Sequence, residues 1–403
     1  LREAPAGLAA AAAPAEVVTR RPGEPVAALV ARLADAPAPL TLVQTPPGRA
    51  ELEDALDDGF HLARETAAAW VAARRGSARW LYLYDSTADH PELHGAMAGF
   101  ARSLGWEHPD LAMRVIGHAG LDPAAVLSAE LTQAGPVEVL VEPGARLVSG
   151  WERTELPEGP GALTGGPGVH LVTGGTGALG LAFAARLAER DPAATVLLAG
   201  RTAPEPAVLE GLRGTGADIR FVRADLATRD GVRSAVEQAR EAGELVGVAH
   251  LAGTLHDSFL LRKSREESDA VLRPKVLGAA WLDQATRHDP LRYFLAYSST
   301  AAAFGNVGQA DHATASGYLD RLAARRAERA AAGERSGTSL SVQWPLWTDG
   351  GVTAEPAVVS AMADRFGMRP VRTGPAMAAL ERALAGAPPA VLLAPGDADR
   401  IAT

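Results

Sequence analysis

Three glycines that follow a short β-branched run have the spacing of a nucleotide-binding turn. Residues 169–173 are followed at once by Gly174, Gly177 and Gly180, and the pattern then becomes helical. Such a turn lets the backbone approach a pyrophosphate closely, and the N-terminus of the next helix favours an anion. Because the glycines lie between an expected strand and an expected helix, the sequence predicts a nucleotide site, with three packing glycines as the alternative.

A basic residue after the next expected strand indicates which nicotinamide cofactor this site would take. An acidic residue at this place binds a ribose 2′-hydroxyl, whereas a basic residue accommodates a 2′-phosphate. Arg201 comes just after the strand expected at 194–199, which favours NADPH over NADH, with an unliganded surface arginine as the alternative. Asp225 and Leu226 follow the third expected strand, where the aspartate can accept a hydrogen bond from an adenine amino group.

The elements that must position these residues form two blocks of alternating apolar runs and amphipathic stretches, the pattern of α/β architecture. In the second block, strands are expected at 169–173, 194–199, 218–222, 246–251 and 293–298, which predicts a complete doubly wound parallel sheet. In the first block, strands are expected at 39–44, 79–84, 111–116 and 137–141, with a helix over 52–75. No strand of the first block is followed by a glycine-rich turn, so it is expected to be a truncated, Rossmann-like subdomain without a cofactor.

Composition shifts along the chain suggest three segments. The Ala-rich start, residues 1–16, has the composition of a linker within a longer polypeptide. A Gly/Pro-rich stretch at 156–168 then interrupts the α/β pattern. We therefore expect a linker at 1–16, a structural subdomain at 17–160 and a catalytic subdomain at 161–403.

Composition also excludes several classes of function. The 403 residues include no cysteine, and no cluster of histidines and acids has metal-ligand spacing, so no metal is expected. The net charge of −9 argues against a nucleic-acid partner. No apolar stretch approaches the roughly 18 residues of a membrane span. A cytoplasmic protein without membrane or nucleic-acid contacts is therefore expected.

Several further motifs occur in a fixed order along the chain. They are TGGTGALG, AGR, ADL, HLAG, a lysine within RPKVLGA, YSS followed by GNVGQAD, and WPLW. This set resembles the ketoreductase domains of modular type I polyketide synthases, complex members of the short-chain dehydrogenase/reductase superfamily. Those domains pair a cofactor-free subdomain with a catalytic one, so the resemblance covers nearly the whole chain. The FGNVGQAD stretch looks more like synthases whose acyltransferases are separately encoded.

The resemblance implies which other residues line the NADPH site. They come from the glycine-rich turn and from HLAG: Thr176, Ala178, Leu179, Ala252 and Gly253. It also implies the partners of such a domain, which are a β-ketoacyl thioester, the acyl carrier protein that delivers it, and neighbouring synthase domains.

Four side chains carry the family's chemistry, and this chain matches two of them. The family uses a tyrosine as proton donor to the carbonyl, a serine that polarises its oxygen, a lysine that lowers the tyrosine pKa, and an asparagine that supports the proton relay. Lys275 matches the lysine and Ser299 matches the serine. The tyrosine position is occupied by His312 and the asparagine position by Ser316, so the resemblance implies a degenerate catalytic set.

An imidazole at residue 312 would be a competent general acid or base, since its ordinary pKa lies near 6.5. Lys275, a bound nicotinamide cation or simple burial would favour its neutral form, which gives up a proton reluctantly. An imidazole is also shorter than a phenol, and a shortfall of about 1 Å can cost on the order of a hundredfold in rate. We therefore expect poor proton transfer from His312 to an alkoxide.

Three functions stay open on this basis. In the first, the domain is a degenerate ketoreductase that keeps the fold and serves as a scaffold, with or without NADPH binding. In the second, it reduces β-ketoacyl thioesters slowly through His312 or water. In the third, it epimerises the α-carbon with His312 as base and without hydride transfer. The substitution of two groups that should hold one geometry favours the first.

The resemblance also implies residues that contact substrate or control stereochemistry. Asp257 matches the final aspartate of the B-type Leu-Asp-Asp motif, and Phe304 occupies the A-type tryptophan position. Gln309 belongs to the run just before residue 312, and Trp344 and Trp347 match the segment that borders nicotinamide and pantetheine. An ordinary loop aspartate and hydrophobic packing of the tryptophans are the alternatives.

Overall fold

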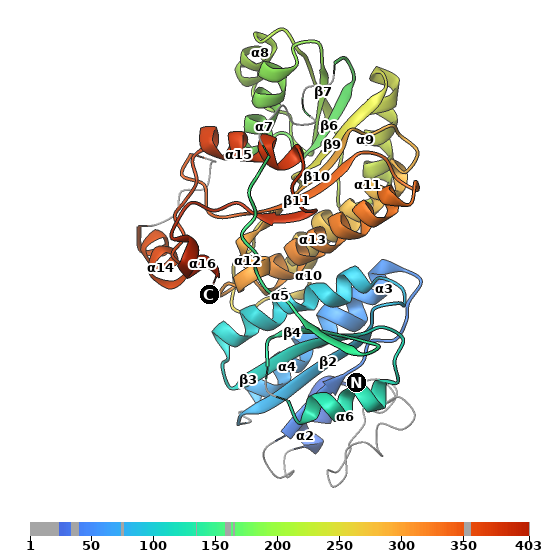
Figure 1. The fold of residues 1–403 in the computed structure, drawn as a ribbon, viewed down its shortest axis with the longest axis vertical. Coiled ribbons are helices and arrows are strands. Elements are labelled where there is room, and N and C mark those ends of the chain that lie inside the picture. The colour runs from blue at the N-terminus through green and yellow to red at the C-terminus, as the bar shows by residue number, and fades with distance from the viewer. Residues whose placement is uncertain are drawn as a thin grey trace. The chain divides into compact units, whose positions relative to one another are not determined.

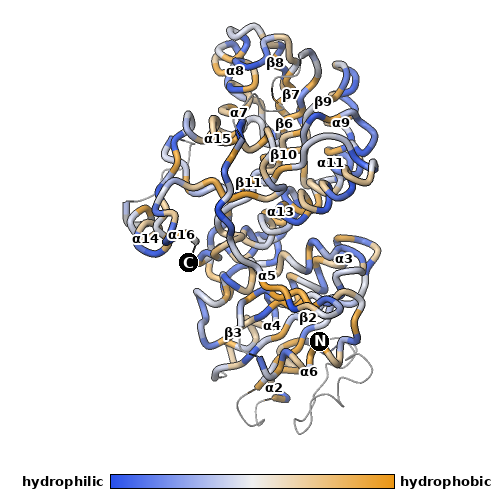
Figure 2. Tube along the Cα trace, in the orientation of Figure 1, coloured by the Kyte–Doolittle hydropathy of each residue, from blue (hydrophilic) through white to orange (hydrophobic). Residues whose placement is uncertain are grey.

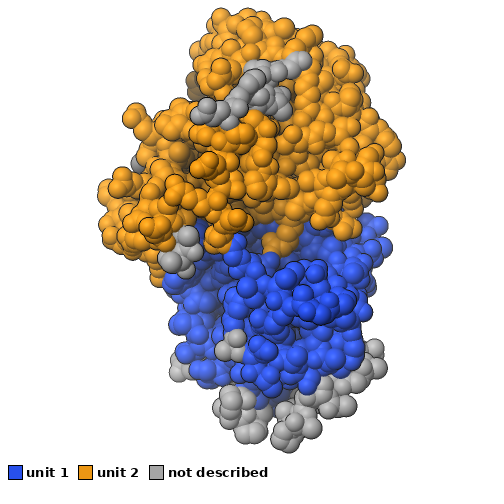
Figure 3. Space-filling view, in the orientation of Figure 1, with its two compact units in different colours: residues 1–150, 255–269, 301–318 blue, residues 151–254, 270–300, 319–403 orange. Residues whose placement is uncertain are grey.

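A computed structural model describes residues 24–33, 40–73, 76–133, 135–157, 163, 166–349 and 356–402. The chain divides into two compact units (Figure 3). Unit 1 comprises Leu1–Gly150, Leu255–Asp269 and Ala301–Tyr318, and unit 2 comprises Trp151–Thr254, Ala270–Thr300 and Leu319–Thr403. The linker expected at 1–16 lies outside the described residues, and the functional boundary expected at residue 160 stays a prediction.

Unit 1 contains a five-stranded sheet with the order β1-β2-β3-β4-β5. Its strands are β1 (Leu40–Gln44), β2 (Ala78–Asp85), β3 (Leu111–His118), β4 (Glu138–Glu142) and β5 (Ala145–Val148). The first four are parallel, and β5 pairs antiparallel with β4 as a hairpin. Because the strands follow each other in sequence order, the sheet has no point at which the order reverses, as expected of a truncated Rossmann-like subdomain.

Helices pack against both faces of this sheet (Figure 1). On one face, Phe100 of α5 lies edge-on against Trp80 of β2 and Phe60, with ring centroids 6.4 and 5.5 Å apart. On the other face, Val126 and Leu127 of α6 join the core formed by apolar residues of β2, β3 and β4. The helices that belong wholly to unit 1 are α2 (Val26–Arg32), α3 (Leu52–Leu56), the π-helical turn η1 (Asp57–His61), α4 (Leu62–Ala72), α5 (Pro91–Glu107) and α6 (Pro123–Leu131).

Unit 2 contains a seven-stranded parallel sheet with the order β12-β11-β10-β9-β6-β7-β8. Its strands are β6 (Val169–Thr173), β7 (Thr195–Gly200), β8 (Asp218–Arg223), β9 (Leu245–His250), β10 (Tyr293–Ser299), β11 (Thr338–Trp344) and β12 (Ala390–Leu392). Every residue of β6 and β9 is buried, as is typical of parallel strands covered on both faces, and the hydropathy along the chain is drawn in Figure 2. The order reverses between β6 and β9, and doubly wound folds bind ligands beyond the carboxyl ends of the strands at such a point.

The sheet of unit 2 is covered on one face by α7 and α15 and on the other by α9 and α11 (Figure 1). Helix α9 begins after Thr228, whose hydroxyl accepts a hydrogen bond from the Gly231 amide at 3.1 Å, and this N-cap fixes where the helix starts. The helices are α7 (Ala178–Arg190), α8 (Pro206–Arg213), α9 (Arg229–Ala242), η2 (Arg273–Leu277), α11 (Gly278–Ala285), α14 (Pro356–Phe366), α15 (Thr373–Leu384) and α16 (Ala398–Ala402). Helices α10 (Arg265–Leu272), α12 (Thr300–Phe304) and α13 (Ala310–Ala331) have residues in both units.

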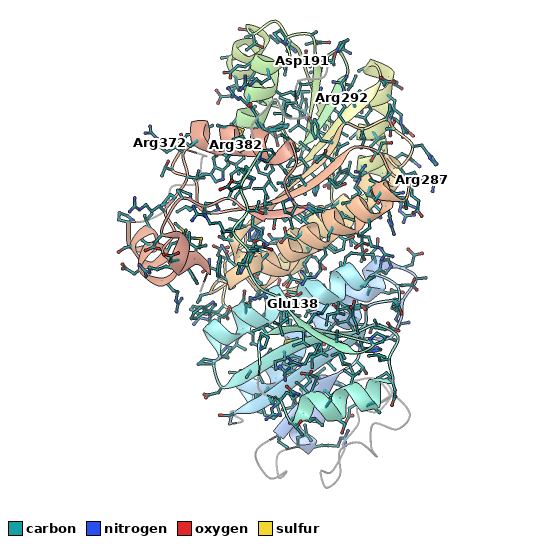
Figure 4. All side chains as sticks on the ribbon, viewed as in Figure 1. Glu138, Asp191, Arg287, Arg292, Arg372 and Arg382 are labelled. Atoms are coloured by element: carbon teal, nitrogen blue, oxygen red, sulfur yellow. The ribbon has the colours of Figure 1, made fainter. Side chains whose placement is uncertain are left out.

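Two arginines bind the Gly/Pro-rich connection to unit 2. Arg292 donates to the carbonyls of Gly166 and Pro167 at 2.8 and 3.0 Å. Arg382 of α15 donates to the carbonyl of Leu156 at 2.6 Å, and both arginines are labelled in Figure 4. The part of this stretch that the structure describes is therefore attached to unit 2 by hydrogen bonds.

The predicted fold class, α/β with a truncated and a complete Rossmann-like sheet, is confirmed. Each expected strand is present to within two residues at its described ends, and the apolar stripe of the helix expected at 52–75 is buried. Strands β5, β11 and β12 were not expected. In β11 the residues Ser339, Ser341 and Gln343 alternate with apolar ones, a pattern typical of a strand with one polar face, yet all three polar side chains are buried.

Candidate functional site

The glycine-rich turn connects β6 to α7 at the point where the strand order of unit 2 reverses. Gly174 has a φ of +68°, and a Cβ there would lie 2.7 Å from the backbone of Leu251 and Ala252. A Cβ at Gly180 would lie 2.5 Å from the carbonyl oxygen of Gly174. Both positions therefore exclude any side chain, and they bring β6, β9 and α7 into close contact.

The start of α7 has the features of an anion site. Gly177 is its N-cap residue and provides no side-chain cap, and both Gly177 and Ala178 are exposed. A Cβ at Gly177 would meet only the carbonyl oxygen of Gly174, at 3.5 Å. Backbone N–H groups at the start of this 13-residue helix are thus accessible to a ligand, whereas Leu179 packs against the core. This donor set fits the pyrophosphate of a dinucleotide.

Arg201 lies directly after β7, beside the glycine-rich turn. A Cβ at Gly200 would lie 2.8 Å from the hydroxyl oxygen of Thr176, so the end of β7 and the turn are in close contact. The Arg201 side chain is exposed, and within the described part of the chain its guanidinium has no hydrogen bond or ion pair. It is therefore available to an anionic ligand.

Asp225 and Leu226 form the turn between β8 and α9. The Asp225 carboxylate accepts a hydrogen bond from the Ala227 amide at 3.0 Å and remains exposed, whereas Leu226 is buried. The carboxylate is thus fixed by its own turn at the carboxyl edge of the sheet. The carboxylate oxygens can accept further hydrogen bonds, including one from an adenine amino group.

Lys275 lies within the π-helical turn η2 that precedes α11. Such turns are rare and frequently occur at functional sites. Its side chain is buried and passes Gly253, where a Cβ would lie 3.2 Å from the Lys275 Cε. Burial lowers the pKa of Lys275 to about 8, and the charge of Asp320 opposes that shift. Gly253 therefore leaves room for the lysine.

Two buried polar groups near Lys275 were not identified from the sequence. Asp320 accepts hydrogen bonds from Ser341 at 2.7 Å and Gln343 at 2.6 Å, and burial raises the pKa of its carboxyl group. His250, which ends β9, shares a hydrogen bond of 2.8 Å with the Thr173 hydroxyl. Burial, and then the charge of Lys275, lowers the pKa of His250 to about 3, so this imidazole is neutral. The polar alternation of β11 was the signal that could have indicated a buried partner such as Asp320.

Ser299 is the last residue of β10 and pairs with Trp344 of β11. Ser298, just before it, donates a hydrogen bond to Asp320, so the acid holds the end of this strand. Ser299 and Lys275 both belong to unit 2. Trp344 and Trp347 are buried in the core of the same unit with ring centroids 5.0 Å apart, an arrangement typical of packing residues.

His312 and Ser316 belong to unit 1, on the first turns of α13. Ser316 is fully buried, whereas His312 is partly exposed. Helix α5 lies close by, because a Cβ at Gly99 would lie 2.5 Å from the Ala313 carbonyl oxygen. The first turns of α13 are therefore packed tightly within unit 1.

Unit 1 also contains three of the residues expected to control substrate binding. Gln309 donates to the carboxylate of Asp257 at 2.8 Å, which joins the two segments that carry them. The carbonyl of Phe304 accepts from the Trp106 indole at 2.8 Å. The structure thus brings Asp257 and Gln309 together and fixes the backbone at Phe304.

Neither a cluster of metal ligands nor a membrane-spanning helix is present among the described residues. No group of three or more His, Asp or Glu side chains in these ranges could hold a metal ion. No helix among them has the length and apolar character needed to cross a bilayer.

Comparisons with known proteins agree with this architecture. Residues 168–349 match the KR domain family model. The chain is 43% identical over 227 residues to polyketide synthase ThaG of Burkholderia thailandensis, a match that covers 55% of this chain and 4% of that protein. It is 30% identical over 327 residues to polyketide synthase PksN of Bacillus subtilis, covering 79% of this chain and 6% of that protein. The chain therefore spans only a small part of these relatives.

Solved structures give the same result at the level of the whole fold. A crystal structure of a ketoreductase domain from the bacillaene assembly line superimposes with a TM-score of 0.81 at 26% identity, covering 90% of this chain and 93% of that one. An A-type ketoreductase from a modular polyketide synthase superimposes with a TM-score of 0.79 at 26% identity, covering 93% and 82% of the two chains. With its nucleotide turn, its two sheets and these matches, the chain belongs to the ketoreductase-domain family of polyketide synthases.

Proposed function

We propose that this domain binds NADPH but is degenerate as a reductase of carrier-bound β-ketoacyl thioesters. The accessible start of α7 and the exposed Arg201 support binding of a pyrophosphate and a 2′-phosphate. The observation that carries the loss of activity is the imidazole at residue 312, at the position where the family has a phenol. When bound, NADPH supplies the hydride.

In this proposal the chain's own groups have separate tasks. By the family's pattern, Ser299 polarises the ketone oxygen and Lys275 contributes positive charge. His312 places an imidazole where the family has a phenol, so the alkoxide would lack the family's proton donor. Ser316, fully buried, lacks the amide of the asparagine that supports the family's proton relay. Reduction would then lack an efficient proton source even with cofactor and ketone in place.

The remaining assignments are part of the same proposal. The acyl carrier protein and neighbouring synthase domains are the partners, and Asp225, Leu226, Ala252 and Gly253 complete the cofactor site. The match of Asp257 to the final aspartate of the B-type motif supports B-type stereochemistry for any reduction, and Gln309 donates a hydrogen bond to its carboxylate. In this proposal residues 17–160 have a structural role, and residues 161–403 bind the cofactor and carry the catalytic positions.

The test is a pair of assays on the purified protein. With NADPH and either a racemic cyclic ketone or a β-ketoacyl N-acetylcysteamine thioester, we expect no oxidation of the cofactor above the blank. With an α-deuterated 2-methyl-3-keto thioester, we expect the label to be retained. Steady NADPH oxidation would overturn the proposal in favour of a slow reductase, and protein-dependent loss of the label would overturn it in favour of an epimerase.

Arg201→Glu is expected to weaken NADPH binding by about tenfold to a hundredfold, since a charged hydrogen bond contributes about 1.5–3 kcal/mol. NADH, which has no 2′-phosphate, should bind the two proteins alike. The measurement is the thermal shift or cofactor fluorescence, because a ligand at about 100 times its Kd stabilises by roughly 2.7 kcal/mol.

The matched control for this variant is Arg287→Glu, which makes the same charge change in unit 2. Arg287 is exposed and precedes β10, so it lies at the amino edge of the parallel sheet, opposite the carboxyl edge where β7 ends (Figure 4). Equal loss of NADPH affinity in both variants would show a general effect of charge and would contradict the role of Arg201.

A further inference from the structure

The chain contains only two lysines, and the one outside the family's catalytic set has an unusual environment. Of 39 lysines and arginines, only Lys263 and Lys275 are lysines. The side chain of Lys263 is 1% exposed and forms an ion pair with Asp311, whose side chain is also 1% exposed. A chain that otherwise relies on arginine therefore keeps a lysine at a buried position within unit 1.

The geometry around Lys263 accounts for the choice of lysine. Its ammonium group donates to both carboxylate oxygens of Asp311, at 2.7 and 2.8 Å, and to the carbonyl of Gly308 at 3.1 Å. An ammonium group has three donors, so these three acceptors satisfy it completely. The five donors of a planar guanidinium would leave buried N–H groups without partners at the same place.

Asp311 links Lys263 to the backbone of residue 312. Its Oδ1 accepts a hydrogen bond from the backbone amide of His312 at 2.8 Å, in addition to the lysine. Asp311 is the second residue of α13, so the ion pair also fixes where the helix begins. The Lys263 side chain is therefore linked through one carboxylate to the backbone that carries the imidazole.

A second carboxylate fixes the same two segments to α5. Glu107 accepts from the Leu260 amide at 2.7 Å and from the Gly308 amide at 2.9 Å. The Ser258 amide donates to the Gly308 carbonyl at 3.1 Å. Gly308 has a φ of +78°, so this turn is held in a conformation that glycine adopts readily. Residues 258–263 and 308–312 thus form one cross-linked body within unit 1.

We propose that Lys263 is a positioning residue of the ketoreductase site, which holds residue 312 in place through Asp311. This inference rests on the proposed function only because that proposal assigns residue 312 to the site. Lys263 itself is not assigned a contact with the cofactor or the substrate. A buried ion pair is weak evidence for stability, so a purely structural role is the competing explanation that the test must separate.

The first readout needs no enzymatic activity. Ring ¹H–¹³C signals of the histidines are recorded in the full chain, and those of His312 are assigned by their loss in His312→Gln. We expect Lys263→Met and Asp311→Asn to shift the His312 signals and Lys263→Arg to shift them less. The control is Glu130→Gln, because Glu130 is a buried acid of unit 1 that binds Arg114 and Arg146 instead. Unchanged His312 signals in folded Asp311→Asn or Lys263→Met would overturn the proposal.

The second readout uses the restored reductase His312→Tyr/Ser316→Asn. Adding Lys263→Met should lower kcat by on the order of a hundredfold, the cost of a misplacement of about 1 Å, with KM and the Kd for NADPH unchanged. Adding Glu130→Gln should leave kcat unchanged. Equal kcat values with and without Lys263→Met would overturn the positioning role. A failure of the double variant to gain activity would instead contradict the proposed function, and the histidine signals would still decide the role of Lys263.

Discussion

Replacing His312 by tyrosine together with Ser316 by asparagine is expected to raise NADPH-dependent ketone reduction by about a hundredfold or more. A positioned general acid contributes typically 10²–10⁴-fold, and this change returns a phenol to the position where the family has its proton donor. Burial lowers the pKa of Lys275 to about 8, so this lysine is still largely charged at pH 7 and can favour the phenolate that forms. The measurement is the initial rate of NADPH oxidation with a cyclic ketone, with the alcohol identified as product.

The matched control keeps the aromatic ring and removes only the hydroxyl. His312→Phe/Ser316→Asn should gain no activity, since its ring has no proton to transfer. Because Ser316 is fully buried, asparagine adds atoms to a packed helix interface, and overpacking costs typically 1–3 kcal/mol. We therefore expect both double variants to melt earlier than the unmodified chain. Equal rates in the tyrosine and phenylalanine variants would contradict the assignment of residue 312 as proton donor.

Asp283→Ala is expected to destabilise unit 2 by about 3–5 kcal/mol. Asp283 of α11 forms ion pairs with Arg326 at 3.1 Å and Arg335 at 2.9 Å. The Arg326 side chain is 1% exposed, and its guanidinium lies 4.7 Å above the ring of Phe294. Burial lowers the pKa of Arg326 to about 10, and Asp283 opposes that shift, so the alanine variant leaves a buried cation without its counter-charge.

The comparison is made by urea unfolding followed by circular dichroism. The control is Asp289→Ala, which removes a carboxylate from the same unit. Asp289 binds Arg240, whose side chain is 45% exposed and can be hydrated when its partner is lost. This variant should lose no more than about 1 kcal/mol. Similar losses for the two variants would show that burial of the arginine does not determine the cost.

The sequence predicted features that are encoded locally. The expected strands and the glycine-rich turn each depend on residues within a few positions of one another, and they are present; the stretch expected as one helix from residue 52 is divided among α3, the π-helical turn η1 and α4, which ends at Ala72. The alternation of polar and apolar residues in β11 is a local strand signal, but it does not show that a buried serine and a buried glutamine of this strand bind Asp320, about 20 residues earlier. A local pattern cannot reveal that a polar face is satisfied from another element.

The same limit explains why Lys263 and Asp311 were not identified. They are 48 residues apart, and nothing near either of them in the sequence marks a buried pair. Glu107, which accepts from the Leu260 and Gly308 amides of the same two segments, comes from the block expected to have no cofactor. Motifs show which residue types are present. Ion pairs that hold a backbone in place between distant segments can be identified only from the folded structure.

The π-helical turn at Lys275 makes the direction of that side chain sensitive to chain length. Each residue of an α-helix advances the side-chain direction by about 100°. Deletion of one residue between Lys275 and α11 would therefore rotate the Lys275 side chain relative to α11 by that angle. A lysine so rotated would no longer pass Gly253. The π-helical turn therefore acts as a one-residue insertion. Its removal would turn the Lys275 side chain away from the proposed site, although every residue type assigned to that site would be preserved. Alignments of such domains should treat a gap at this turn as a change of function.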